Sequence, residues 1–334
     1  MDLGRLAVTL PAARVSSLEN VDLARRAEKE WGYEAIWLAE TNGPDSASFA
    51  GAVAMATQRV DIGTAIVPVY NRTPALLAMT AATLAELSKD RFILGVGSSS
   101  HAMMEGWNGL TFERPLAHVR DSVAILRQAL AGQKTDYAGE ALHSKGFRLG
   151  TRGPVPRVYV AALRERMLEL AGEIGDGLIL NLFPAEALPK ILAAYRRGAQ
   201  RAGRDASNDE IVCRLMIAVT DDVAGARNLV RAGFAGYFAQ PVYNAYLRWY
   251  GFEREADAVA DAFARGDRAA SAAALSDEMI DSIAILGSAE ACRERIAAYV
   301  AGGVTTPVLA PLAGGLAGVT AVFETLAPGR SGNG

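Results

Sequence analysis

Short apolar segments alternate with longer amphipathic segments from one end of the chain to the other. The apolar segments have the length and composition of buried strands. They are Leu6–Leu10, Ala35–Leu38, Val60–Ile66, Phe92–Val96, Val158–Ala161, Gly177–Leu180, Ile211–Val219 and Thr306–Ala310. The segments between them have helical periodicity, with Ser16 or Ser17 as the cap of the first helix and Pro74 in the first turn of a later one.

This alternation of strands and helices predicts a parallel sheet covered by helices. Right-handed crossovers allow a doubly wound sheet or a closed barrel. Because eight strand–helix units are present and no Gly-x-Gly-x-x-Gly follows the first strand, we predict an α/β protein with a (β/α)8 TIM barrel. We expect one domain over residues 1–328 and a disordered tail over 329–334.

Three stretches interrupt the alternation and are expected to be insertions, at about 98–115, 133–153 and 241–275. The second is rich in glycine and polar residues and is interpreted as a hairpin. The third has helical periodicity and carries Tyr243, Tyr246, Trp249, Tyr250 and Phe252. It is either a wall or lid over the barrel mouth or a pair of helices packed on the barrel. A further helix is predicted near Asp277–Ile285.

The composition excludes several classes of function. A net charge of −3 without a Lys/Arg-rich run does not indicate nucleic-acid binding. The two cysteines, Cys213 and Cys292, lie in apolar contexts without metal-ligand spacing and are predicted to be buried packing residues. The N-terminus does not have the pattern of a signal peptide and no apolar stretch is long enough to span a membrane, so we expect a cytoplasmic protein. No His/Asp/Glu cluster has metal-ligand spacing, so we expect no metal.

The barrel fold places the active site at the carboxyl ends of the strands. The strand end at 62–68 has small residues that would let a flat ring approach the backbone, or would simply pack tightly. Gly95 and Gly97 alternate on the next strand and precede three serines at 98–100. These hydroxyls suit a ribityl chain or ring carbonyls, although a serine-rich turn has the same composition.

A third candidate is the strand-to-helix turn at 158–166. The free N–H groups of a helix start form a natural phosphate site, and Arg164 and Arg166 add positive charge. An ordinary turn of this kind has the same pattern. Among ionisable residues, Glu40 directly follows an apolar strand and could serve as an acid or base, or remain a solvated carboxylate. His101 is a candidate proton relay, whereas His118 lies in an amphipathic helix and is interpreted as structural.

Several of these motifs together resemble the luciferase-like oxidoreductases, over most of residues 3–310. The resemblance rests on the order and spacing of four strings, which are Thr57-Gln58-Arg59-Val60-Asp61-Ile62-Gly63-Thr64-Ala65-Ile66-Val67-Pro68, Arg72-Thr73-Pro74-Ala75, Leu84-Ala85-Glu86-Leu87-Ser88 and Arg91-Phe92-Ile93-Leu94-Gly95-Val96-Gly97. Within the family the sequence is more similar to the branch that uses the deazaflavin coenzyme F420 than to the FMN monooxygenases.

The resemblance implies particular site residues. It implies a cis peptide bond at Ala65–Ile66, in a bulge behind the deazaflavin ring. It implies phosphate contacts, largely through backbone N–H groups, at Ala162, Leu163 and Arg164. The implied ring and ribityl contacts are Glu40, Thr64, Ala65, Ile66, Gly97, Ser98 and Ser99.

The sequence also departs from the sugar-phosphate dehydrogenases of this branch. They have a histidine where this chain has Thr41, and an acidic residue near the position of Ser99–Ser100. A sugar-phosphate substrate is therefore not indicated, and Glu40 and His101 are the candidates for the catalytic acid or base.

The expected function is a coenzyme F420-dependent oxidoreductase that transfers a hydride between the deazaflavin and a small organic substrate. The alternatives are an FMN-dependent monooxygenase on the same barrel and a non-catalytic cofactor-binding protein. A homodimer is expected from the resemblance and from the frequency of two-fold assemblies.

Overall fold

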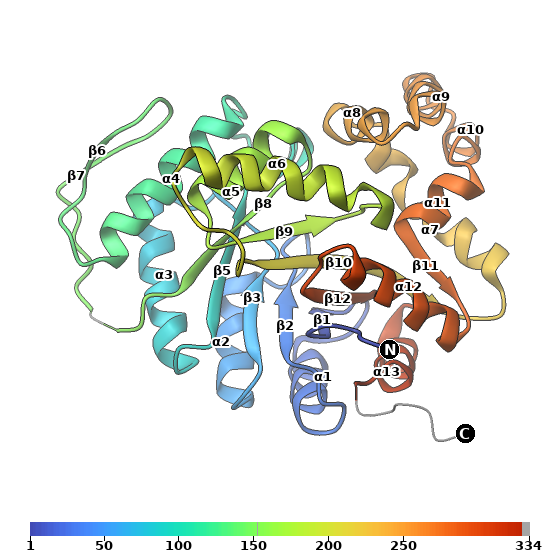
Figure 1. The fold of residues 1–334 in the computed structure, drawn as a ribbon, viewed down its shortest axis with the longest axis horizontal. Helices are drawn as coiled ribbons and strands as arrows, with labels where there is room; N and C mark the ends of the chain where they lie inside the picture. The colour runs from blue at the N-terminus through green and yellow to red at the C-terminus, as the bar shows by residue number, and fades with distance from the viewer. Residues whose placement is uncertain (152, 329–334) are drawn as a thin grey trace.

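The apolar segments form parallel strands that pair in a closed ring (Figure 1). The computed structural model of the chain describes residues 1–151 and 153–328, and the predicted tail at 329–334 lies outside the described residues. The ring closes because β10 pairs with both β9 and β12, which confirms the predicted (β/α)8 barrel. In ring order the strands are β1 (Ala7–Leu10), β2 (Ala35–Leu38), β3 (Asp61–Thr64), β5 (Phe92–Gly97), β8 (Arg157–Ala161), β9 (Gly177–Asn181), β10 (Glu210–Val219) and β12 (Thr306–Pro311).

Helices cover the outside of the ring and begin at the caps that the sequence indicates. Ser16, rather than Ser17, caps the first helix in a capping box with Glu19, and Thr73 caps the helix that starts at Pro74. The covering helices are α1 (Ser17–Lys29), α2 (Ser46–Ala56), α3 (Pro74–Leu87), α4 (Pro115–Leu130), α5 (Glu165–Ile174), α6 (Leu188–Arg201), α12 (Ala289–Ala301) and α13 (Gly315–Thr325), with the short turn η2 (Ala185–Ala187) before α6. In the described part of the chain, none of the helices has the length and apolar character needed to cross a membrane.

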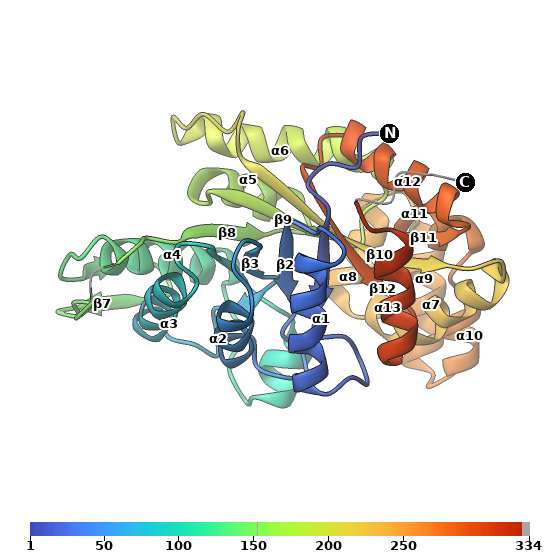
Figure 2. The ribbon, with the colours of Figure 1, turned by 90° about the horizontal axis from the view of Figure 1, so that it is seen from below.

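The three stretches interpreted as insertions contain further elements in the described residues. The first contains the π-helix η1 (Ala102–Trp107), and the second is an antiparallel hairpin of β6 (Asp136–Ala138) and β7 (His143–Lys145). The third follows α7 (Val223–Phe238) and consists of α8 (Pro241–Trp249), α9 (Glu253–Ala264) and α10 (Arg268–Ala273). The hairpin and the α7–α10 group lie at opposite ends of the long axis of the molecule (Figure 2).

The prediction of a helix over Asp277–Ile285 was wrong at its end. Helix α11 stops at Ile283, and Ala284–Gly287 forms strand β11, which pairs with the last residues of β10 from Met216 to Val219. This strand has only four residues and follows the helix without a turn residue, so it has no alternation of its own to distinguish it from a last helical turn.

The third barrel strand is interrupted where the resemblance implies a bulge. Strand β3 therefore covers only Asp61–Thr64 of the predicted strand Val60–Ile66. Gly63 pairs with Ile93, and Val67 of the short strand β4 (Val67–Pro68) pairs with Val96. Four steps on this strand therefore match three on β5, so one extra residue is accommodated at Ala65–Ile66. The Ala65–Ile66 peptide bond is cis, as implied, and Leu10–Pro11 is also cis.

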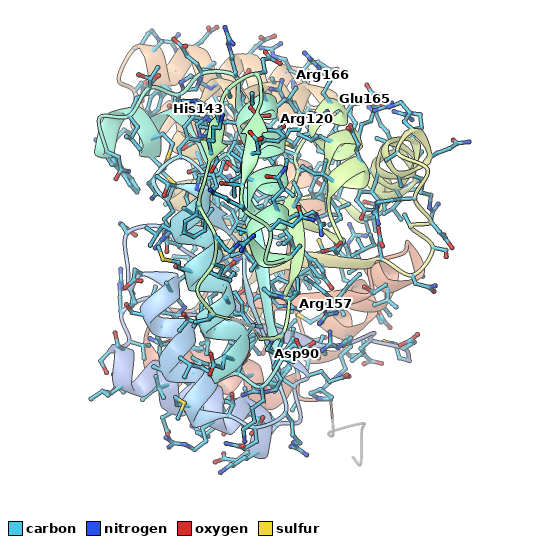
Figure 3. All side chains as sticks on the ribbon, turned by 90° about the vertical axis from the view of Figure 1, so that its left-hand side faces the viewer. Asp90, Arg120, His143, Arg157, Glu165 and Arg166 are labelled. Carbon is cyan, nitrogen blue, oxygen red and sulfur yellow. The ribbon has the colours of Figure 1, made fainter. Side chains whose placement is uncertain are left out.

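The barrel interior is stacked in levels along its axis. At the amino ends of the strands, Arg5 binds Asp61 at 2.6 Å and Glu210 at 2.9 Å, and Arg157 binds Asp61 at 3.1 Å. The middle level is a separate apolar cluster of Ala7, Ala35, Trp37, Ile93, Tyr159, Ile179, Val212 and Val308. Above this cluster, at the carboxyl ends, the barrel opens. In Figure 3, Arg157 and Asp90 lie lower in the view than Glu165 and Arg166, which are near the top.

Candidate active site

A cavity of about 1380 Å³ lies at the carboxyl ends of the strands, where the barrel fold predicts the active site. It reaches from the barrel axis to helices α7 and α8. Pockets for one drug-sized ligand have roughly 300–1,000 Å³. The cavity is therefore large enough for a cofactor together with a second molecule.

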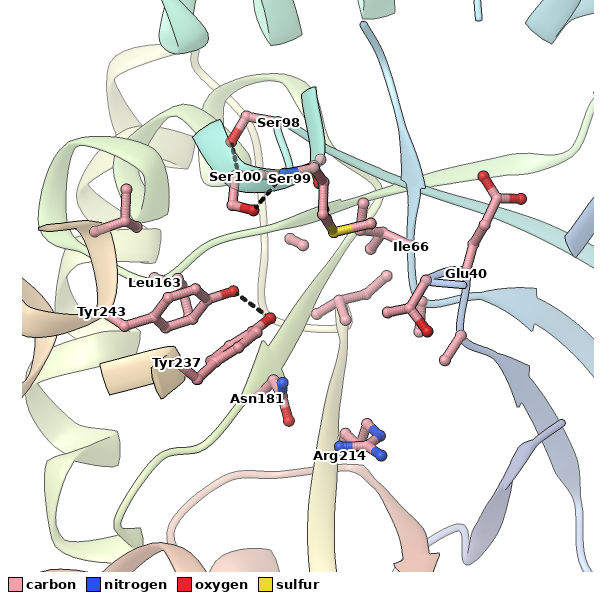
Figure 4. Close-up of a pocket in the computed structure, with 18 of the residues that line it drawn as sticks. Glu40, Ile66, Ser98, Ser99, Ser100, Leu163, Asn181, Arg214, Tyr237 and Tyr243 are labelled. Carbon is pink, nitrogen blue, oxygen red and sulfur yellow. Dashed lines mark hydrogen bonds between the residues drawn. The ribbon is translucent and has the colours of Figure 1, made fainter. Parts of the chain in front are cut away.

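One wall of the cavity is the bulge at Ala65–Ile66 together with Gly97 (Figure 4). Both bulge side chains pack against the interior apolar cluster. A Cβ atom at Gly97 would lie 3.3 Å from Ile66 and 3.4 Å from Ala161 Cβ, so any larger residue would crowd these two cavity-lining side chains. The result is a flat apolar wall against which a ring could lie.

Gly95 and Thr64 pack against each other behind this wall. A Cβ atom at Gly95 would lie 1.8 Å from the Thr64 carbonyl oxygen. Only glycine at this position therefore allows the two backbones to lie so close together. The buried Thr64 hydroxyl donates to the Gly95 carbonyl at 2.8 Å and accepts from its N–H at 2.9 Å. Thr64 does not line the cavity, so its predicted contact with a cofactor stays a prediction.

The predicted phosphate turn lies on the cavity rim beside the start of α5. Ala162, Leu163 and Arg164 all line the cavity. The Ala162 N–H already donates to the Ile179 carbonyl at 3.2 Å. Among the described residues, the N–H groups of Leu163 and Arg164 have no acceptor. Together with the N–H groups of Glu165 and Arg166 at the start of α5, they provide donors suited to an anion.

The predicted serine contacts lie next to this turn. Ser98 and Ser99 line the cavity at the end of β5, and Ser99 has a left-handed backbone with φ of 65°. The Ser99 hydroxyl contacts the Met103 sulfur at 3.3 Å, and Ser98 has only a long contact of 3.5 Å to the Ser99 carbonyl. The Ser98 hydroxyl is therefore largely free to bind a polar group in the cavity.

Glu40 lines the cavity but is held by other residues of the protein. Its carboxylate accepts hydrogen bonds from Arg72 and from the Ser46 N–H and hydroxyl, at 2.8 and 2.7 Å for Ser46. Burial alone would raise the pKa of Glu40, but the hydrogen bonds from Arg72 and Ser46 together hold it below its ordinary value. Glu40 is therefore an anion near neutral pH.

His101 lies outside the cavity lining. Its side chain is half exposed, its ring meets the edge of Phe112, and Nδ1 lies 3.5 Å from a Glu105 carboxylate oxygen. Its catalytic role stays a prediction that these contacts do not support. His118 stacks on Tyr70 with ring centroids 3.9 Å apart and does not line the cavity.

The floor of the cavity contains polar residues that the sequence analysis did not single out as a group. Arg214 of β10 and Asn181 of β9 lie side by side in paired register, and both face the cavity (Figure 4). Thr9 of β1 completes the floor. The alternation of Glu210, Val212 and Arg214 on one face of β10 is a sequence signal that could have placed Arg214 inside the barrel.

Helices α7 and α8 form the wall opposite the bulge, so the third insertion contributes to the site. Phe234, Tyr237, Tyr243 and Trp249 line the cavity, and the Tyr243 hydroxyl donates to the Tyr237 hydroxyl at 2.7 Å. The buried Tyr246 hydroxyl donates to the Leu182 carbonyl and ties α8 to the end of β9.

A closed parallel barrel with a bulged third strand, a flat apolar wall and free N–H groups at a helix start defines a barrel enzyme that binds a phosphate-bearing ring cofactor. The chain belongs to the luciferase-like monooxygenase family, which it matches over residues 2–306. This confirms the resemblance inferred from the sequence motifs.

Two sequence relatives and one solved structure illustrate what the chain is similar to. A 5,10-methylenetetrahydromethanopterin reductase of Archaeoglobus fulgidus is 30% identical over 284 residues, which cover 83% of this chain and 85% of the relative. A Mycobacterium tuberculosis protein named "Putative coenzyme F420-dependent oxidoreductase" is 30% identical over 319 residues, covering 85% and 88%. The coenzyme F420-dependent tetrahydromethanopterin reductase of Methanopyrus kandleri has the same fold, with a TM-score of 0.81 at 21% identity and 97% coverage of both chains.

Proposed function

We propose that this protein is a coenzyme F420-dependent oxidoreductase that transfers a hydride between the deazaflavin and a small organic substrate. The observation that carries the proposal is the flat wall of Ala65, Ile66 and Gly97, which faces a cavity large enough for a ring and a substrate. The names of one sequence relative and of one protein with the same fold include this coenzyme, which supports the proposal.

The residues present fit the coenzyme. The ring would lie against Ala65, Ile66 and Gly97, with Ser98 and Ser99 near its polar chain. The free N–H groups of Leu163 and Arg164 would bind its phosphate. Bound F420 supplies a ring carbon that accepts or donates the hydride, and the protein supplies orientation and electrostatics.

The proton that accompanies the hydride needs a separate group. A substrate that gains a hydride must also gain a proton, and one that loses a hydride must lose a proton. Glu40, as an anion, could only accept. The Tyr237 hydroxyl lines the cavity and is hydrogen-bonded to the Tyr243 hydroxyl at 2.7 Å, so we add Tyr237 as a candidate proton donor beside the acid/base candidates Glu40 and His101.

The experiment that tests the proposal is a parallel titration of the apo-protein with F420 and with FMN, followed by fluorescence. Tight binding of F420 with weak binding of FMN is the expected result. Preference for FMN would assign the protein to the monooxygenases on this barrel. Binding of neither would favour the non-catalytic alternative.

We also propose that the protein is a homodimer. Met55 of α2 and Leu76 and Met79 of α3 are exposed on neighbouring helices outside the barrel, and such side chains favour a protein interface. Light scattering coupled to size-exclusion chromatography would give twice the chain mass of 35.3 kDa if this is correct.

A further inference from the structure

We propose that Arg214, with Asn181 and Thr9, binds a carboxylate of the substrate, so that the substrate is a small carboxylic acid. This inference rests on the proposed function for the identity of the ring that lies opposite. The binding of the anion itself can be tested without any coenzyme.

The guanidinium of Arg214 has no anionic partner in the described part of the chain. It makes no hydrogen bond or ion pair, and its Nε atom is buried without an acceptor. The side chain as a whole is only partly buried and lines the cavity, so the rest of its guanidinium faces this space, where no carboxylate of the described residues meets it. The protein therefore holds a cation on the cavity floor that lacks its counter-ion.

The other end of the barrel provides a direct contrast. Arg5 and Arg157 bind Asp61 at the amino ends of the strands, and Arg5 also binds Glu210. Burial alone would lower the pKa of Arg5, but Glu210 and Asp61 raise it above its ordinary value. Burial lowers the pKa of Arg214, and no carboxylate counteracts it. The same fold thus pairs its interior arginines at one end and leaves Arg214 unpaired at the other.

The neighbours of Arg214 complete a carboxylate-binding set. Asn181 is its paired residue on β9, and the Asn181 side-chain oxygen is buried without a partner. Because the oxygen and nitrogen of an amide can exchange places, Asn181 can also present its N–H₂. The Thr9 hydroxyl, on β1 beyond β12, is buried without a partner as well. A guanidinium fork, an amide and a hydroxyl match the acceptor positions of a carboxylate.

The position of Arg214 indicates substrate rather than coenzyme. Strand β10 lies diametrically opposite β3 in the ring, four strands away in either direction. A ring on the wall of Ala65 and Ile66 would therefore leave Arg214 on the other side of the cavity, where a substrate facing the ring must lie. The aromatic side chains of Phe234, Tyr237 and Trp249 border the same space, so we expect the acid to carry an apolar or aromatic body.

The test uses benzoate as the probe and benzamide as its uncharged match, titrated by calorimetry into the apo-protein. We expect benzoate to bind and benzamide to bind at least 10-fold more weakly. In the Arg214→Met variant we expect benzoate affinity to fall by about 10- to 100-fold, the usual effect of losing a charge-assisted pair. The Arg25→Met variant removes an exposed arginine of α1 and should leave both affinities unchanged.

The outcomes separate this inference from the proposed function. Equal binding of benzoate by wild type and Arg214→Met, or equal binding of benzoate and benzamide, overturns it. A loss of F420 affinity in Arg214→Met without a change in benzoate binding assigns Arg214 to the coenzyme and also overturns it. Absence of F420 binding in every variant, with benzoate binding still dependent on Arg214, refutes the proposed function alone.

A second variant guards against misfolding. Arg214→Lys keeps the charge but not the planar fork. We expect it to prefer benzoate over benzamide while binding benzoate more weakly than wild type. Loss of that preference in a folded Arg214→Lys protein would overturn the inference.

Discussion

Adding a methyl group at either of two glycines on β5 should have two different effects. Gly95→Ala should destabilise the barrel, whereas Gly97→Ala should weaken cofactor binding. At Gly95 the new Cβ atom would meet the Thr64 carbonyl oxygen at 1.8 Å and Ile179 at 2.6 Å. The oxygen belongs to the backbone just before the bulge and cannot move without separating β3 from β5. Since overpacking of a core commonly costs about 1–3 kcal/mol, we expect Gly95→Ala to lower the free energy of unfolding by about 3 kcal/mol.

At Gly97 the same change should have a small effect on the free energy of unfolding and a large effect on cofactor affinity. The new Cβ atom would lie 3.3 Å from the flexible end of Ile66 and 3.4 Å from Ala161. A shift of a few tenths of an ångström relieves these contacts, so the free energy of unfolding should stay within about 0.5 kcal/mol of wild type. The methyl group occupies the surface where the ring would lie, and we expect F420 affinity to fall about 10-fold or more, which is about 1.4 kcal/mol.

Urea unfolding followed by circular dichroism measures the first effect, and F420 titration measures the second. Wild-type protein is the reference for both, and each variant is the control for the other. The reasoning is refuted if Gly95→Ala unfolds at the wild-type midpoint, or if Gly97→Ala is stable and still binds F420 with wild-type affinity.

Three further predictions concern other parts of the molecule. Glu40→Gln should lower turnover or cofactor affinity and should reduce stability at neutral pH by about 1–2 kcal/mol, because it weakens the bond with the half-buried Arg72. Since the folded-state pKa of Glu40 lies below its ordinary 4.5, this stability is present above that pH and is lost as the pH falls through the folded value, so melting curves of wild type and variant should converge in acid. A deazaflavin that lacks the phosphate should bind much more weakly than F420, and equal affinity would remove the turn at Arg164 from the site. Arg5→Met should lower the melting temperature without changing F420 affinity, because its ion pairs lie at the far end of the barrel, and a change in affinity would contradict that separation.

The sequence predicts the barrel well because each strand is a short apolar run whose helix follows with its own caps. The motif resemblance also places the bulge at Ala65–Ile66 correctly. Strand β11 was missed because its four residues take their strand conformation from pairing with β10, which lies more than sixty residues earlier in the chain. Secondary structure that depends on a distant partner has no local signal.

Side-chain environments were harder to predict than strand ends. The sequence places Glu40 at the barrel mouth. It does not show that Arg72, in the loop between β4 and α3, forms a hydrogen bond with it. It does not show that His101 contacts Glu105 and Phe112 without lining the cavity itself. The alternation along β10 could have placed Arg214 inside the barrel, but only the structure shows that its side chain faces an open space without a carboxylate partner among the described residues.

The attachment of α8 to the barrel determines how molecules can enter. Tyr246 donates to the Leu182 carbonyl, and Tyr299 of α12 donates to the Phe183 carbonyl, so the segment after β9 is tied to both helices. Swinging α8 outward would break a buried hydrogen bond, whereas the loops at 11–15 and 40–44 border the cavity with exposed residues. Exchange of ligands should therefore proceed past these two loops, and their rate of opening would limit how fast a product leaves.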